Sequence, residues 1–119
     1  MKTPKLIYPP EGGTFYPCDY TVNNRKIKRL IISNHYKKKH SKYMNDKLII
    51  KFIEDYLDGE SFYDGEKDGP WEYFELEPIL YQDENYILVW LLHEDIPDFL
   101  GVVHCRYSNI KVNSYEKKK

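Results

Sequence analysis

Apolar residues recur at helical spacing in one stretch of the chain. Between Asn45 and Gly59 they stand at Leu48, Ile49, Phe52, Ile53, Tyr56 and Leu57. This spacing gives one continuous stripe, so it predicts an amphipathic helix over residues 45–59 that packs on a core. Asn45 is expected to cap its first turn, and Gly59 stands where a left-handed residue commonly follows a helix.

A shorter helix is expected before it, over residues 34–43, with Ser33 or Asn34 as its cap. Three of its residues recur at helical spacing and are expected to lie at the edge of the core: Tyr36, His40 and Tyr43.

Alternation and runs of β-branched and aromatic residues predict strands elsewhere. Two strands before the helices form a hairpin through the turn Asn23-Asn24, and three strands after them form an antiparallel meander. The expected ranges are 14–22, 26–33, 71–80, 86–93 and 99–107. The segment 86–93 is apolar on both sides, which is typical of a central strand covered on both faces.

This order of elements predicts an α+β fold. We expect two helices packed on one face of a four- to five-stranded, mainly antiparallel sheet, in the order β(β)-α-α-β-β-β. At 119 residues the chain has room for a single domain, residues 1–119. Within it, the Pro- and Gly-containing residues 1–13 are expected to form an irregular arm, and residues 109–119 a basic tail.

The sequence does not have the features of a membrane or secreted protein. The longest apolar run, residues 86–92, spans seven residues, whereas a membrane-spanning helix needs about 20. The N-terminal residues do not form a signal peptide, and Cys18 and Cys105 lie outside any C-x-x-C motif. We therefore expect a cytoplasmic protein with reduced thiols and no membrane partner.

Charge is distributed unevenly along the chain, although the formal net charge is only −1. Residues 1–51 carry twelve Lys or Arg and three Asp or Glu. Residues 52–99 carry one Lys and fifteen Asp or Glu, and residues 100–119 are basic again. Such blocks either neutralise one another across the folded surface or face different partners.

The candidate chemistry begins in the last expected strand. His104 and Arg106 are two residues apart, so strict alternation places both on the face of Leu100 and Val102, with Tyr107 on the other face. Imidazole can transfer protons near neutral pH, and guanidinium can hold a phosphate through paired hydrogen bonds. The pair is a candidate phosphate site, and the alternative is an exposed strand end with ordinary polar residues.

A second candidate region is the first expected helix. His35 and Lys39 are four residues apart and share a helix face, which either faces a substrate or is a solvated surface. The chain contains no H-E-x-x-H motif, and its acidic loop at 60–68 lacks the ligand order of a calcium loop. No Gly-rich phosphate loop opens a helix, so no metal and no cofactor are expected.

The order of elements and two segments resemble the RelE-like toxin and ribonuclease superfamily over residues 26–108. The segments are ISNHYKKKH, residues 32–40, and NYILVWLLHEDIPDFLGVVHCRYS, residues 85–108. In that superfamily a strand leads to a helix with His or basic residues, and a later hairpin ends in a strand with a basic or aromatic pair. The matching positions here are His35, Lys39 and His40, followed by His104, Arg106 and Tyr107.

The resemblance implies a metal-independent endoribonuclease that acts on RNA, free or on the ribosome, and that has a cognate partner protein. It implies catalytic roles for His104, Arg106, Tyr107 and His35. The residues expected to contact RNA are Arg29, Lys37, Lys38 and Lys39. The chain departs from many such toxins because it is slightly acidic overall and because residues 1–25 precede the matched segment.

Two other hypotheses come from different functional classes. The chain can be a non-catalytic interaction module, such as an antitoxin-like or immunity-like inhibitor, whose acidic residues 54–99 cover a basic partner. It can also be a small soluble protein whose charges serve only solubility, because fold likeness alone does not establish function.

Overall fold

The structure is a computed structural model that describes residues 12–109. The expected arm at 1–13 and tail at 109–119 lie almost wholly outside the described residues, and Gly13 already belongs to the first strand. The elements are β1 (Gly13–Val22), β2 (Arg25–Ser33), the 3-10 turn η1 (Asn34–Tyr36), α1 (Lys37–His40), α2 (Asp46–Phe52), the π-helical turn η2 (Ile53–Leu57), β3 (Glu66–Asp68), β4 (Trp71–Tyr81), β5 (Glu84–His93) and β6 (Ile96–Tyr107).

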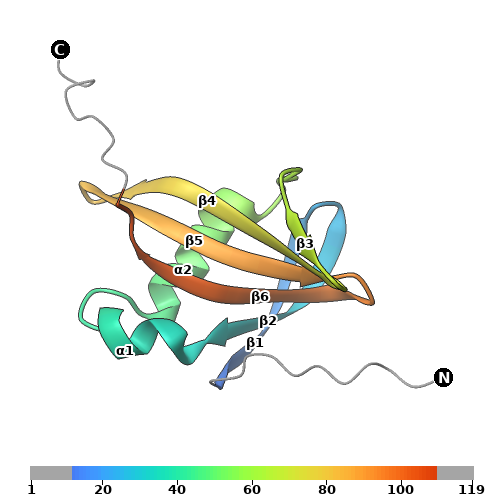
Figure 1. Ribbon diagram of the computed structural model, residues 1–119, viewed down its shortest axis with the longest axis horizontal. Coiled ribbons are helices and arrows are strands. Elements are labelled where there is room, and N and C mark those ends of the chain that lie inside the picture. Colours follow the sequence, from blue (N-terminus) through green and yellow to red (C-terminus); the bar gives the residue numbers. More distant parts are fainter. Residues whose placement is uncertain (1–11, 110–119) are drawn as a thin grey trace, which may run out of the picture.

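All of these strands form one six-stranded sheet in the order β1-β2-β6-β5-β4-β3 (Figure 1). The pair β2–β6 is parallel, and the other neighbouring pairs are antiparallel. The α+β class is confirmed, but the expected four- to five-stranded, mainly antiparallel sheet is wrong, because the sheet is six-stranded and mixed. The missed strand, β3, is three exposed charged residues long and has no apolar pattern to reveal it.

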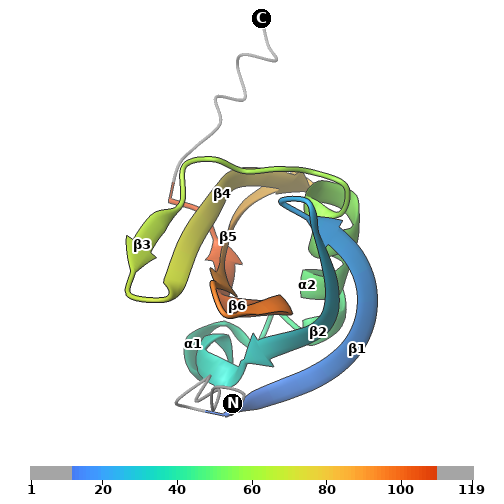
Figure 2. The ribbon, with the colours of Figure 1, turned by 90° about the vertical axis from the view of Figure 1, so that its right-hand side faces the viewer.

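The sheet curves around α2 and η2 (Figure 2). The Tyr20 hydroxyl on β1 donates a hydrogen bond to Glu54 at 2.9 Å, and the Tyr56 hydroxyl donates to the Leu80 carbonyl on β4 at 3.2 Å. Because β1 and β4 are separated by three strands in the sheet, only a curved sheet lets both contact the same helical turn. The curvature closes the core between the sheet and this helix.

The two expected helices have different outcomes. The second is confirmed in position: the Asn45 side chain accepts a hydrogen bond from the Leu48 N–H at 2.8 Å, and Gly59 has a φ of +87°. The first is only η1 and one turn of α1, and α1 buries none of its residues. Packing of both helices on one sheet face is therefore wrong for α1, whose lysines give it no apolar stripe.

Buried side chains cover both faces of the sheet. The larger cluster lies between the sheet and α2, and it includes Ile49, Phe52, Leu88, Trp90, Leu100 and Val102. A smaller cluster on the opposite face is built on Leu91, Ile96 and Phe99. Burial of each such side chain contributes roughly 1.5–3 kcal/mol to the stability of the fold. Both clusters include residues of β5 and β6, so these two strands lie at the centre of the core. Among residues 12–109, no helix is both long enough and apolar enough to span a membrane.

Candidate active site

A β-bulge in β6 sets the direction of the histidine on that strand. Val89 of β5 pairs with His104, but the next residue, Trp90, pairs with Val102. Val103 is therefore an extra residue in β6, and an extra residue interrupts the alternation of side chains between the two faces of a sheet. Bulges commonly redirect a side chain in this way near functional sites.

The bulge corrects one expectation about the last strand. Leu100 and Val102 belong to the buried cluster beneath α2, and so does Cys105, which follows the bulge. His104 and Arg106 do not join that cluster and instead line a hollow at the surface. The expectation that they share the face of Leu100 and Val102 is thus wrong, although the two still project together.

The hollow exists because β2 ends before β6 does. The parallel pairing between the two strands stops at Ile32 and Val102, and η1 and α1 then take the place of β2 beside the rest of β6 (Figure 1). The His35 ring lies 5.0 Å from the His104 ring, and the His40 ring lies 5.3 Å from it, measured between centroids. Three imidazoles therefore meet at this end of the sheet.

This hollow, which we call the histidine hollow, has a volume of about 410 Å³ and a basic lining. Its lining residues are His35, Lys38, Lys39, His40, His104, Arg106 and Asn109. Within the described part of the chain, no Asp or Glu contributes to this lining. Its charge therefore suits a bound anion.

His104 is held in its neutral form. Burial lowers the pKa of His104 from 6.5 to about 4, and the neighbouring His35, His40 and Arg106 lower the pKa further in that order of importance. Its Nδ1 atom is buried and has no hydrogen-bond partner, so an imidazolium there would leave a buried N–H unsatisfied. At neutral pH the ring is therefore unprotonated.

His40 is oriented by a tyrosine. The Tyr43 hydroxyl lies 2.9 Å from His40 Nδ1 and also accepts a hydrogen bond from the Tyr107 N–H at 3.1 Å. The hydroxyl can donate its single hydrogen to His40 Nδ1, and in that tautomer Nε2 carries the imidazole hydrogen. Burial lowers the pKa of His40, with smaller contributions from Arg106 and the nearby Lys39.

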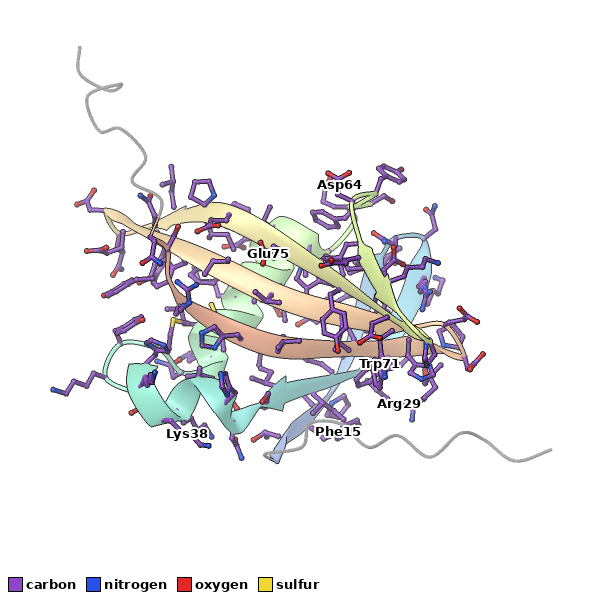
Figure 3. All side chains as sticks on the ribbon, in the orientation of Figure 1. Phe15, Arg29, Lys38, Asp64, Trp71 and Glu75 are labelled. Carbon is purple, nitrogen blue, oxygen red and sulfur yellow. The ribbon has the colours of Figure 1, made fainter. Side chains whose placement is uncertain are left out.

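The structure brings together five of the eight residues assigned from sequence: His35, Lys38, Lys39, His104 and Arg106. Tyr107 instead stacks on Tyr43, with ring centroids 3.7 Å apart. The Lys37 ammonium lies 6.0 Å from the centroid of the Tyr36 ring. Arg29 pairs with Asp98 away from the hollow, and Figure 3 shows Arg29 well separated from Lys38.

His40 matched a position of the resemblance but was given no catalytic or RNA-binding role, because it was expected at the edge of the core. In one continuous helix, residues five apart such as His35 and His40 do not share a face. Here they lie in separate turns, η1 and α1, and both reach the same ring of His104. The only sequence signal was two histidines flanking a lysine run, which does not show that β6 lies beside them.

The chemistry that this arrangement allows is anion binding with proton transfer. Among residues 12–109, no group of three or more His, Cys, Asp or Glu is arranged to hold a metal ion. Comparisons of the chain with protein-family models, with curated proteins and with solved structures give no match. The resemblance to RelE-like ribonucleases therefore stays a prediction.

Proposed function

We propose that the chain is a metal-independent endoribonuclease whose histidine hollow binds the scissile phosphate of RNA. The observation that carries the proposal is the convergence of three imidazoles, a guanidinium and two lysine side chains on one hollow, with no carboxylate among its described lining residues. Metal-independent RNA cleavage needs a proton acceptor, a proton donor and a cation for the phosphate, and these groups supply all three.

In the proposed reaction, neutral His104 takes the proton of the ribose 2′-hydroxyl. The 2′-oxygen forms a bond to phosphorus, and the bond from phosphorus to the 5′-oxygen of the next nucleotide breaks. His40, in its imidazolium form, gives a proton from Nε2 to that leaving oxygen. The products are a 2′,3′-cyclic phosphate and a 5′-hydroxyl, and neither an oxidant nor a metal takes part.

Substrate binding prepares these groups for their roles. A phosphodiester in the hollow carries a negative charge, which favours imidazolium and raises the pKa of both His40 and His104 toward neutrality. A pKa near the working pH is the value at which an imidazole transfers protons most effectively. Arg106 then stabilises the charge that develops on the phosphate oxygens.

The test is cleavage of a single-stranded RNA by the purified full chain in the presence of a chelator. We expect products with 2′,3′-cyclic phosphate and 5′-hydroxyl ends, and no cleavage of the same sequence made with 2′-O-methyl ribose. The variant His104→Ala should lose about 10²- to 10⁴-fold in rate while it keeps a wild-type circular dichroism spectrum. Intact RNA after incubation with wild type, both free and bound to ribosomes, would refute the enzyme.

A further inference from the structure

A second hollow, which we call the tyrosine hollow, has a volume of about 450 Å³ and lies beside the histidine hollow. Its lining includes Tyr43, Tyr81, Tyr86, Tyr107, Lys47 and Lys51. Four aromatic rings and two ammonium groups thus surround one space, which has no carboxylate among its described lining residues. Aromatic rings interleaved with cations are the usual composition of a groove for single-stranded nucleic acid.

Two tyrosines of the second hollow connect it to residues of the histidine hollow. The rings of Tyr43 and Tyr107 are parallel within 3° and lie 3.7 Å apart. The Tyr43 hydroxyl is hydrogen-bonded to His40 of the histidine hollow, while its ring lines the second hollow. Arg106 and Tyr107 are consecutive on β6, so they project to opposite sides, one into each hollow.

The aromatic surface formed by the tyrosines of the second hollow is accessible. Tyr107 is 37% exposed, which is unusual for a large ring at the end of a central strand, whereas Tyr86 is only 5% exposed and forms the floor. Tyr86 packs against Tyr107 with centroids 5.2 Å apart and against Phe52 at 5.0 Å, so the floor is fixed by the core. A flat ligand can therefore stack on a rigid aromatic surface at little cost in side-chain entropy.

We infer that the tyrosine hollow binds an unpaired nucleobase of the RNA whose phosphate occupies the histidine hollow. This inference rests on the proposed function, and it specifies single-stranded RNA as the substrate class, because a base held in a duplex cannot stack on a protein ring. Arg106 and Tyr107 are consecutive residues that line one hollow each, so adjacent parts of one nucleotide chain can occupy both. Lys47 supplies positive charge for the neighbouring phosphate, whereas the Lys51 ammonium is paired with the Asp55 carboxylate at 3.0 Å.

Two probes separate base binding from phosphate binding. The first is a short 2′-O-methyl oligoribonucleotide, which lacks the attacking hydroxyl, and the second is the same backbone with abasic sugars. By isothermal titration calorimetry we expect the first to bind at least about ten-fold more tightly than the second, as stacking of one base allows. Inorganic phosphate should bind at the histidine hollow of the same protein.

Matched variants assign the preference to the tyrosine hollow. Tyr81→Ala should reduce the preference for bases to less than about three-fold and leave phosphate affinity unchanged, whereas Tyr63→Ala, on a side chain that is 87% exposed, should leave both unchanged. If Tyr81→Ala does not fold, a variant of the exposed Lys47 is tested in its place. Lys47→Ala should weaken oligonucleotide binding, in contrast to Lys26→Ala on β2, which is exposed and lines neither hollow.

The outcomes distinguish the two proposals. Equal affinity for base-containing and abasic probes, with phosphate still bound, would overturn the nucleobase site and leave the ribonuclease standing. An equal loss in Tyr63→Ala and Tyr81→Ala would also overturn it. If neither phosphate nor either oligonucleotide binds, the proposed function fails and the nucleobase site fails with it.

Discussion

The strand β6 passes through two different environments along its length. Its first part lies between β5 and β2, where Leu100 and Val102 are buried and where Asp98 receives two hydrogen bonds from Arg29 of β2, at 2.7 and 3.2 Å. Its last part has lost β2 as a neighbour. There His104 and Arg106 face a helical segment that contributes histidines and lysines.

The two arginines show what this difference means. Arg29 is matched by a carboxylate that accepts both arms of its guanidinium, so its charge is compensated within the fold. The Arg106 guanidinium donates to the Tyr107 carbonyl at 2.8 Å and lies in a hollow without a described carboxylate, where it helps to lower the pKa of two histidines. Crowded like charges oppose folding, and a bound anion relieves them. An arginine of β2 is thus structural beside the first part of β6, and an arginine at the last part of β6 is available for a ligand.

The largest expected effect separates these two arginines directly. Arg106→Ala should lower kcat/KM for RNA cleavage by about 10²- to 10³-fold, because it removes the main cation for the transition-state phosphate. Arg29→Ala should stay within about three-fold of wild type, because its side chain is already paired outside the hollow. Steady-state kinetics on one RNA substrate measure both. Equal losses in the two variants would remove the distinction between the ends of β6.

Much of the fold follows from local patterns. The apolar stripe between Asn45 and Gly59 and the strand segments on either side are set by side-chain periodicity, which one sequence displays. The pairing of β2 with β6 was not predictable in this way, because residues about seventy positions apart meet only through the path of the whole chain. A hairpin followed by a meander is equally compatible with several strand orders.

The candidate site was predictable only in part. The chemistry of His104 and Arg106 was visible as residue types two positions apart, but the bulge at Val103 that directs them has no sequence mark in a run of apolar residues. The division of the first helix into η1 and α1, in which His40 lies beside His104, is likewise not visible in local residue spacing. The residue types of the site were therefore predictable from the sequence, and the directions in which their side chains project were not.

The second prediction concerns what the burial of His104 costs in stability. The unfolded chain protonates His104 near pH 6.5 and the folded chain only near pH 4, so between these values the unfolded state holds more protons and stability rises with pH. We expect this ring to contribute a loss of about 1–3 kcal/mol in unfolding free energy as the pH falls through that window, discounted for its partial exposure. Urea unfolding of wild type and His104→Gln at several pH values measures it. If the unfolding free energy depends on pH in the same way in the two proteins, His104 is not held neutral in the folded state.

A third prediction tests whether an anion relieves the crowding. Sulfate keeps its double charge through the pH range of interest, so any pH dependence of its affinity reports on the protein. Because a bound anion favours imidazolium, binding takes up protons, and affinity should rise about ten-fold between about pH 7.5 and pH 5.5. Calorimetric titration of wild type gives this slope, and His104→Gln should reduce it. An affinity that does not change with pH would mean that the histidines do not sense the anion.

The smallest expected effect concerns the compensated end. Arg29 and Asp98 have side chains that are 42% and 40% exposed, so their ion pair is screened by solvent and should contribute less than about 1 kcal/mol. A double-mutant cycle with Arg29→Ala and Asp98→Ala, read from unfolding free energies, isolates this coupling from other losses. A small coupling would mean that the pair serves mainly to keep Arg29 matched, since stability would hardly depend on it. A coupling of several kcal/mol would instead make the first part of β6 the stronger electrostatic site and would reverse the contrast with Arg106.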